Sequence, residues 1–262
     1  MSSKSIRVSA RVPVVLLGIP IEGVENPYLV APGGQLRITM TYYECGSPAL
    51  QVSGVPQEVS RRAAEFWRKL TDGLGVSACS TASVEGAEGL PVGGTYAALT
   101  ASLLHLVARA HSDVLSEDEI VEMGRMSDPW EDAPWWQGAV DAMRYCAATG
   151  KSVAYRNDEE AVELSGSGVS AGVESVLAAG KGLSRAELGE SLFDAVVNMM
   201  GQAVLEASDA IRSGSDPMAE ALRRLRVQNA VAYLIYGVRP PEGCLVVPGL
   251  PGFLEVVCPR RG

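Results

Sequence analysis

The stretch Pro91–His105, PVGGTYAALTASLLH, decides how this chain is interpreted. It follows an alternating segment, 76–84 (VSACSTASV), which predicts a strand, and it runs into an Ala/Leu-rich stretch, 95–110, with helical periodicity. A strand, a glycine-rich turn and a helix in this order leave free backbone N–H groups at the start of the helix, where the partial positive charge suits a phosphate. The other interpretation is an ordinary turn that enters a core helix.

The residues of this turn refine the hypothesis of a phosphate site. Gly93 and Gly94 lack a Cβ and would let a phosphate approach the backbone closely, while Thr95 would cap the helix or offer its hydroxyl. The turn is not a Walker loop, because no Gly-Lys-Ser/Thr follows, and it has no Gly-x-Gly-x-x-Gly fingerprint. The motif therefore predicts phosphate binding of another kind.

Composition and charge limit the classes of protein. With 262 residues, 47% of them hydrophobic, the chain can bury a large core as one domain or as two interlocked halves. Its net charge of −9 argues against nucleic acid as a main partner. No signal peptide or membrane-spanning apolar run is evident, so we expect a cytoplasmic protein without a membrane partner. Five scattered cysteines without a zinc-like spacing predict buried thiols: Cys45, Cys79, Cys146, Cys244 and Cys258.

Hydrophobic periodicity predicts a mixed α and β chain. A glycine- and serine-rich segment, 165–172, suggests a boundary, so we expect an N-terminal domain over 1–164 that holds the phosphate loop and a C-terminal α+β domain over 165–262. Strands are expected over 5–17, 36–43, 76–84, 152–156, 161–164, 244–247 and 253–258, and helices over 57–70, 95–110, 116–126, 139–148, 185–212 and 217–236.

This order of elements resembles the GHMP kinase superfamily, which includes galactokinase and the homoserine, mevalonate and phosphomevalonate kinases. In that family a hairpin precedes a strand that leads to a Pro-x-x-x-Gly-Leu-Gly-Ser-Ser-Ala-Ala loop and a helix. Here Leu90–Leu99 (LPVGGTYAAL) keeps the proline and the Gly-x-x-Ala-Ala-Leu end but is shorter. Of the family's opening motif, Ala10–Gly18 keeps the hydrophobic strand and Gly18, whereas Pro13 stands in place of the basic residue and Ile19-Pro20 in place of a Glu-His pair.

A second match concerns the catalytic carboxylate of the family. Gly138-Ala139-Val140-Asp141, closed by Gly150, resembles the Gly-x-x-Asp stretch of archaeal shikimate kinases and of mevalonate kinases. The family aspartate takes the proton from, or orients, the substrate hydroxyl, so the resemblance implies this role for Asp141. Without the resemblance, Asp141 would be interpreted as a solvated helix residue.

A third match is a C-terminal glycine-rich turn, Val247–Phe253 (VPGLPGF), which stands where the family has Gly-Ala-Gly-x-Gly-Gly beside the phosphates. As a bare pattern it predicts only a turn between strands. Together with the first loop, the resemblance implies that nucleotide is bound by Pro91, Gly93, Gly94, Thr95, Tyr96, Gly249 and Gly252.

An insert rich in tryptophan and acidic residues precedes the candidate aspartate. Trp135 and Trp136 would form a wall of the acceptor site, and Arg144 could neutralise a phosphate or an acidic substrate. Glu131 and Asp132 would hold magnesium, which commonly takes one or two carboxylates plus phosphate oxygens. The alternative is an acidic loop whose tryptophans pack the core or a dimer contact.

The resemblance implies a divergent, archaeal-type member with an α+β, GHMP-kinase-like two-lobed fold: a ribosomal-protein-S5-like N-terminal half and a ferredoxin-like C-terminal half. It also implies an ATP- and Mg²⁺-dependent kinase, mevalonate- or shikimate-kinase-like, that phosphorylates a hydroxyl of a small, acidic metabolite. The alternative is a catalytically inactive GHMP-fold protein that binds a ligand or another protein. The shortened loop and the lost Glu-His pair favour this alternative, whereas the spacing of Asp141 and the retained glycines favour the kinase, which is the function that we expect. The sequence leaves open whether the chain forms a homodimer.

Overall fold

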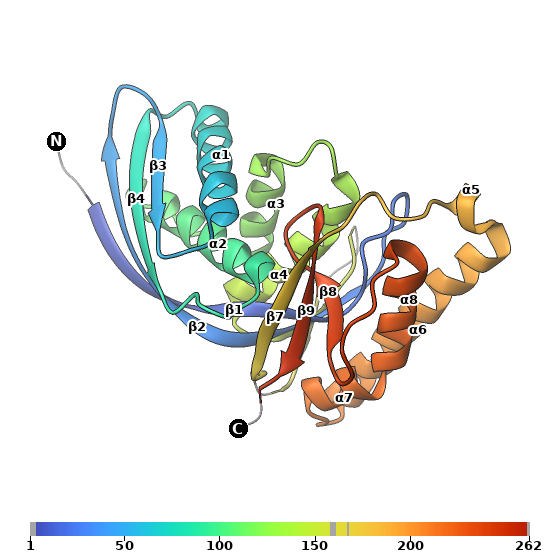
Figure 1. Cartoon of the computed structure of the whole chain (residues 1–262). Coiled ribbons are helices and arrows are strands. Elements are labelled where there is room, and N and C mark those ends of the chain that lie inside the picture. The colour runs from blue at the N-terminus through green and yellow to red at the C-terminus, as the bar shows by residue number, and fades with distance from the viewer. Residues whose placement is uncertain (1–3, 158–160, 167, 261–262) are drawn as a thin grey trace.

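The computed structural model describes residues 4–157, 161–166 and 168–260. Its larger sheet is antiparallel except for the parallel pair β3–β4, and its strands follow the order β3-β4-β2-β5-β6, with β1 paired to β2. Figure 1 shows this sheet with the N-terminal helices beside it. The strands are β1 (Lys4–Leu17), β2 (Tyr28–Glu44), β3 (Ala49–Ser53), β4 (Ala78–Glu85), β5 (Ser152–Tyr155) and β6 (Val162–Leu164).

Four helices cover the larger sheet. α2 and α4 pack directly on β1 and β2, while α1 and α3 pack against α2. Within α2 every residue from Gly93 to Ala108 is buried except His105, because small and aliphatic side chains alternate on all sides of this helix. The helices are α1 (Gln57–Leu74), α2 (Val92–Ala110), α3 (Glu117–Ser127) and α4 (Gln137–Thr149), and a short 3₁₀ turn, Pro134–Trp136, leads into α4.

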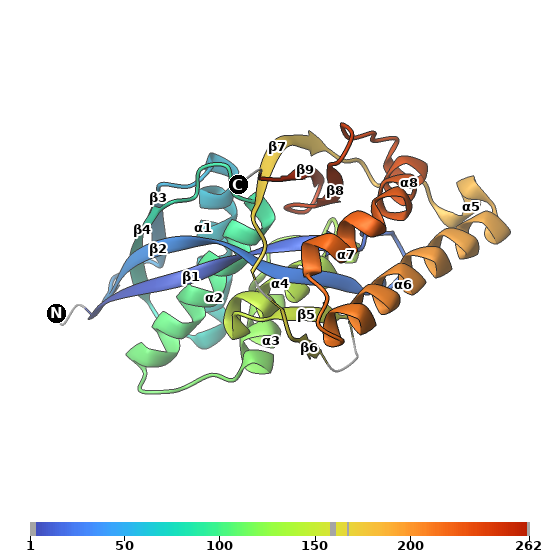
Figure 2. The ribbon, with the colours of Figure 1, turned by 90° about the horizontal axis from the view of Figure 1, so that it is seen from below.

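The C-terminal part consists of a three-stranded antiparallel sheet with strand order β7-β9-β8 and the helices inserted between β7 and β8. Figure 2 shows these helices gathered at one end of the β1–β2 ribbon, while α2 lies toward its other end. The elements are β7 (Ala171–Ala178), α5 (Arg185–Leu188), α6 (Glu190–Arg212), α7 (Pro217–Arg223), α8 (Leu225–Tyr236), β8 (Leu245–Pro248) and β9 (Phe253–Pro259).

The long β1–β2 ribbon joins the two parts of the molecule. One end of β2 (37–44) pairs with β4 and its other end (28–30) pairs with β5, while β1 also packs against β8. The buried Gln228 of α8 holds the junction: its Oε1 accepts from the Gly18 N–H at 3.0 Å, and its Nε2 donates to the Val246 carbonyl at 2.7 Å. The boundary predicted between 164 and 165 stays a prediction.

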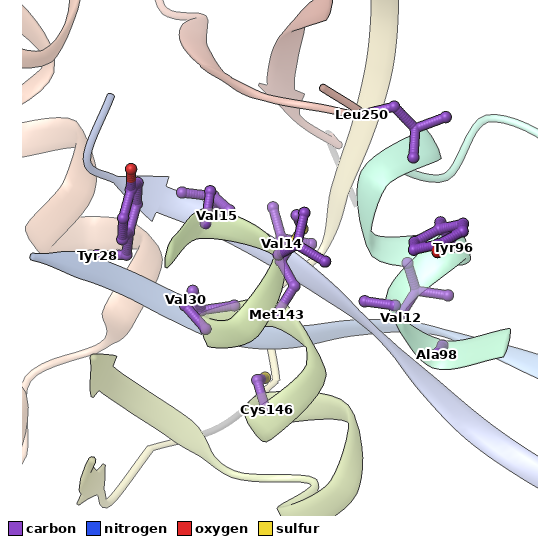
Figure 3. Close-up of a cluster of buried hydrophobic side chains, with 14 of the residues drawn as sticks. Val12, Val14, Val15, Tyr28, Val30, Tyr96, Ala98, Met143, Cys146 and Leu250 are labelled. Atoms are coloured by element: carbon purple, nitrogen blue, oxygen red, sulfur yellow. The ribbon is translucent and has the colours of Figure 1, made fainter. Parts of the chain in front are cut away.

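The hydrophobic core lies between the β1–β2 ribbon, α2 and α4. Figure 3 shows Val12 and Val14 of β1 beside Tyr96 of α2 and Met143 of α4, with Leu250 of the β8–β9 turn at the edge of the cluster. All five side chains are buried. The C-terminal hairpin therefore packs on the same core as the N-terminal helices.

The α+β class is confirmed, and most predicted elements agree with the structure. However, β2 begins at Tyr28, well before the predicted start at 36, and the predicted helices 185–212 and 217–236 are each divided in two. β3 and β7 were not predicted, and β7 begins inside the segment interpreted as a linker, because three glycines and three serines within 165–172 concealed its start. α2 begins at Val92 with Pro91 at the N-cap, so Thr95 lies inside the helix and does not cap it. Within the described residues, no helix is both long and apolar enough to cross a bilayer.

The expectation of five buried thiols was wrong for four of the cysteines. Cys45 is bonded to Cys79, and Cys244 is bonded to Cys258, which leaves Cys146 as a buried free thiol. The sequence spacing concealed both pairs, because each is created by strand pairing: β2 and β4 bring the first pair together, and β8 and β9 the second.

Candidate functional site

The start of α2 is packed against the protein's own backbone. A Cβ on Gly94 would overlap the Pro13 carbonyl oxygen of β1, and a Cβ on Gly93 would lie 2.7 Å from the carbonyl carbon of Gly249. Real Cβ atoms are essentially never found so close to backbone atoms. The missing Cβ atoms therefore make room for β1 and for the β8–β9 turn, and the same space is not free for a phosphate.

A buried carboxylate occupies the helix terminus itself. Glu255 of β9 is completely buried, and its Oε1 accepts from the Gly93 N–H at 2.9 Å, while the Val92 N–H is a further donor to the carboxylate. Burial raises the pKa of Glu255 to about 7, and the two N–H groups oppose this rise. A carboxylate is the anion that an N-terminal helix turn favours, so the position predicted for a phosphate is filled by a side chain.

The structure brings the two predicted glycine turns together. Gly249 lies against Gly93, and a Cβ on Gly249 would meet the Glu255 Oε1 at 2.5 Å. Gly252 lies at the other end of the turn with φ +85°, and its carbonyl accepts from the Ala179 N–H at 2.8 Å. Gly249 therefore touches the start of α2, whereas Gly252 shapes the hairpin.

The remaining residues of the first loop are buried. The Thr95 hydroxyl has no hydrogen-bond partner among the described residues. The Tyr96 hydroxyl donates to Asp128 Oδ1 at 2.9 Å, and burial followed by the Asp128 charge raises the pKa of Tyr96. Tyr96 thus belongs to a polar cluster on the inner side of α2.

Asp141 lies in the same polar cluster, with both carboxylate oxygens engaged. Oδ1 accepts from Gln137 Nε2 at 2.8 Å and from Arg144, and Oδ2 accepts from Arg125 Nε at 2.9 Å. The side chain is fully buried, and burial raises its pKa to about 6 while Arg144 and Arg125 pull it down. A general base must reach the proton that it removes. Asp141 in this geometry has no exposed oxygen for a substrate hydroxyl.

Arg144 is the centre of this cluster and is itself fully buried. Its Nη2 donates to both Asp128 oxygens, at 2.8 and 3.0 Å, and its guanidinium lies 5.7 Å from the centre of the Phe66 ring. A Cβ on Gly124 of α3 would overlap the same guanidinium, so the arginine fills the space between α3 and α4. We expect this paired, desolvated cluster to hold the helices together.

A cavity of about 510 Å³ opens beside the start of α4. Trp135 is half-buried in its wall, and its indole lies beside the Tyr236 hydroxyl. Two carboxylates, Glu22 and Glu25, also line it, so the lining favours a ligand that carries hydroxyl or ammonium donors. The remaining lining residues are Gly23, Val24, Asn26, Tyr28, Pro134, Gly138 and Asn157.

Three other predicted residues lie apart from this cavity lining. Trp136 is completely buried in the core. Glu131 is exposed and forms an ion pair with Lys69 of α1, and Asp132 is exposed as well. Within the part of the chain that the structure describes, neither acid belongs to a group of three metal-ligand side chains. Their role as magnesium ligands stays a prediction.

Sequence reasoning missed Glu255 and the pairing role of Asp128. Glu255 is an acidic residue inside an otherwise apolar strand, FLEVVC, and such a charge needs a partner when it is buried. Sequence reasoning also missed the role of Arg125, which lies in the preceding helix, α3, and whose Nε donates to Asp141 Oδ2 at 2.9 Å.

No family model matches the chain, and no curated protein matches it. Solved structures, in contrast, do match this chain. Mevalonate diphosphate decarboxylase from Staphylococcus aureus is 10% identical with a TM-score of 0.63, covering 99% of this chain and 89% of the other. Mevalonate kinase from methicillin-resistant Staphylococcus aureus is 14% identical with a TM-score of 0.55, covering 98% and 91%. Phosphomevalonate kinase from Streptococcus pneumoniae, solved with phosphomevalonate and AMPPNP, is 9% identical with a TM-score of 0.61, covering 98% and 93%.

The chain therefore has the fold of the GHMP kinase superfamily, and the resemblance read from the sequence is confirmed at the level of the fold. Solved structures with this fold include kinases and a decarboxylase, and one of them holds a nucleotide analogue with its small-molecule substrate. The fold alone does not carry an activity to this chain. The archaeal-type origin stays a prediction.

Proposed function

We propose that this chain is a non-catalytic GHMP-fold protein that binds a small ligand in the cavity beside α4. The observation that carries the proposal is the Glu255 carboxylate on the Gly93 N–H at the start of α2. An ATP phosphate at this terminus would meet the Glu255 side chain, which is negatively charged above about pH 7, and the backbone of Gly249. The residues present therefore do not fit a nucleotide phosphate in this conformation.

The polar cluster supports the same proposal. Asp141 is neutralised by Arg125 and Arg144, and neither of its oxygens faces solvent. Releasing it for proton transfer would break a buried ion pair, which typically costs about 3–5 kcal/mol. The cluster instead has the composition of a structural support, with Asp128 and Asp141 sharing one buried arginine.

The residues that line the cavity indicate which class of ligand would bind there. Glu22 and Glu25 are acceptors at its rim, and the buried Asn26 offers a side-chain oxygen that has no partner among the described residues. These groups suit a ligand with hydroxyl or ammonium donors, and the Trp135 ring provides an apolar surface on which a small molecule can pack. The lining does not favour the acidic metabolite expected from the sequence.

An ATP-dependent small-molecule kinase is the second candidate. It is favoured by the meeting of Gly93 with Gly249, and by the position of Asp141 one helical turn after Gly138, which lines the cavity. In this candidate, Glu255 must leave the helix terminus before ATP and Mg²⁺ bind. Arg144 and Trp136 would contact substrate only after the core around them had opened.

Calorimetry with Mg²⁺–ATP separates the two candidates. We expect no binding by the wild type at millimolar nucleotide, and no ADP release with mevalonate-pathway, shikimate, pantoate or homoserine metabolites. Thermal stabilisation by hydroxylated or amino metabolites, without nucleotide, would support the cavity as the ligand site. Submillimolar ATP binding by the wild type would overturn the non-catalytic proposal.

If any metabolite does give turnover, Asp141→Asn decides the role of the aspartate. Loss of a general base typically lowers the rate by about 10²- to 10⁴-fold. Equal turnover by the wild type and by a variant of matched stability would remove Asp141 from the chemistry. A wild type without turnover would remove the kinase candidate.

A further inference from the structure

The carboxylate of Glu174 lies against the Cys244–Cys258 disulfide. Glu174 belongs to β7, an edge strand of the three-stranded sheet. Glu174 Oε2 is 2.9 Å from Cys258 Sγ and 3.7 Å from Cys244 Sγ. Sulfur atoms in a disulfide carry no hydrogen, so the carboxylate receives no hydrogen bond from them. These are also the only residues among those described whose ligand atoms form a compact group of three, all within 4.8 Å of one another.

The backbone explains how these three residues meet. Cys244 directly precedes β8 and, because Leu245 pairs with Val257, it faces Cys258 on β9. On the other side of β9, the register of β7 shifts between Val173 and Ser175, so Glu174 is the extra residue of a β-bulge. A bulge re-aims the side chain that it carries. The fold thus directs an acidic side chain onto a pair of sulfurs.

We infer that Cys244, Cys258 and Glu174 form a binding site for a thiophilic divalent cation of the zinc type when the disulfide is reduced. A dithiol reductant supplies two electrons and two protons, which convert the S–S bond into two thiols while the reductant is oxidised to its disulfide. The cation then displaces two protons and is held by two thiolates and one carboxylate oxygen.

The geometry of the three groups suits this ligand set. Zinc takes thiolate sulfur at about 2.3 Å and carboxylate oxygen at about 2.0–2.2 Å, and three protein ligands leave a fourth position for water. Cys244 is buried, Cys258 is half-buried and Glu174 is exposed, so an ion can enter from the Glu174 side. The cation would also neutralise the charge that the carboxylate places beside two thiolates.

Cobalt tests the site, because Co²⁺ replaces zinc in thiolate sites and reports its ligands by colour. The full chain is reduced with a phosphine under anaerobic conditions, its fold is checked by circular dichroism, and Co²⁺ is added. We expect one equivalent to bind with a thiolate-to-cobalt charge-transfer band and tetrahedral visible bands. The oxidised protein should show neither, because its sulfurs are bonded to each other.

Three variants identify the ligands. Cys258→Ser should lose the charge-transfer band, whereas the double variant Cys45→Ser/Cys79→Ser should keep it, because among the described residues that pair does not belong to a group of three ligand side chains. Loss of a group that only supports a metal ligand typically lowers metal affinity by about 10- to 100-fold. Glu174 would be a ligand itself, so Glu174→Gln should weaken cobalt binding by at least about tenfold. Cobalt binding that is equal in Cys258→Ser, or equal in Glu174→Gln, overturns the site.

A second readout applies if reduction loosens the fold. Zn²⁺ should protect Cys244 and Cys258 from alkylation by iodoacetamide, as read by peptide mass spectrometry, and should leave Cys45 and Cys79 unprotected. Equal alkylation of all four cysteines with and without Zn²⁺ overturns the inference. Neither measurement depends on whether the cavity beside α4 binds a ligand.

Discussion

Glu255 Oε1 accepts a 2.9 Å hydrogen bond from the backbone N–H of Gly93, across 162 positions of the sequence. The bond joins β9 to the first turn of α2. It places a carboxyl group, which is negative above about pH 7, where the helix dipole is positive, in a position from which water is excluded. The helix start and the C-terminal hairpin are therefore one structural unit.

The first prediction is that stability falls with rising pH because of Glu255. Burial raises its pKa from 4.5 to about 7, so between these values the folded protein holds a proton that the unfolded chain has lost. The free energy of unfolding then decreases as pH rises through that window, by about 3 kcal/mol, and levels off above about pH 7. Asp141, raised to about 6, acts in the same direction.

Glu255→Gln isolates this contribution, since the amide keeps the shape and cannot ionise. Urea unfolding at pH 4.5 and pH 8 should give similar stabilities for variant and wild type at the lower pH. At pH 8 the variant should be the more stable. A variant whose difference from the wild type is the same at both pH values would show that Glu255 does not titrate in this window.

The second prediction concerns Gly94. Because its missing Cβ makes room for the Pro13 carbonyl, Gly94→Ala should destabilise the fold by more than about 2 kcal/mol or prevent folding. Gly201→Ala is the matched control: Gly201 also lies in a helix, α6, but a Cβ there meets nothing within 4 Å. The control should gain about 0.5–1 kcal/mol. Similar urea midpoints for the two variants would contradict the packing at α2.

The third prediction concerns the buried arginine. Arg144→Met leaves Asp128 and Asp141 without their shared partner, and breaking a buried pair from one side costs about 3–5 kcal/mol. Arg61→Met is the control, since the pairs that Arg61 makes with Glu58 and Glu65 are partly exposed and such pairs are worth about 0–1 kcal/mol. Chemical unfolding at pH 7 measures both. Equal losses would mean that the cluster is not a support of the fold.

The fourth prediction concerns Trp135. If the cavity beside α4 binds a small molecule, ligand should change the fluorescence of Trp135, which lies in its wall. Trp135→Phe should abolish the change. Trp67→Phe should preserve it, because Trp67 is a buried residue of α1 whose Nε1 donates to the Ala78 carbonyl. An unaltered ligand response in Trp135→Phe would place the ligand elsewhere.

The sequence predicted the order of strands and helices well, because most of these elements carry a clear hydrophobic period. The local pattern located both glycine segments, and Gly249 does lie in a turn between β8 and β9. Gly93 and Gly94, however, lie inside the first turn of α2 and not in a loop before it. What fills the space between the two segments could not be found this way. Glu255 reaches Gly93 only because β9 returns to the core beside α2, and no local pattern encodes that return.

The same limit applied to Asp141 and to the cysteines. A helix pattern places Asp141 near Arg144, but it cannot show that Arg125 of the preceding helix covers the other carboxylate oxygen. Spacing along the chain likewise gave no sign that Cys45 and Cys79 are paired across strands. Contacts between distant elements decide whether the side chains of a motif are accessible to a ligand or already paired within the protein. These contacts depend on the assembled fold.

Gln228 bridges Gly18 and Val246, so the first strand is completed by residues near the end of the chain. A ribosome makes β1 long before α8, and β8 and β9 follow α8. During synthesis, the Gly18 N–H has no native acceptor until Gln228 has emerged, and the α2 start lacks its carboxylate until Glu255 has emerged. In the nascent chain, the contacts of β1 and of the α2 start therefore stay incomplete until α8 and β9 have been synthesised.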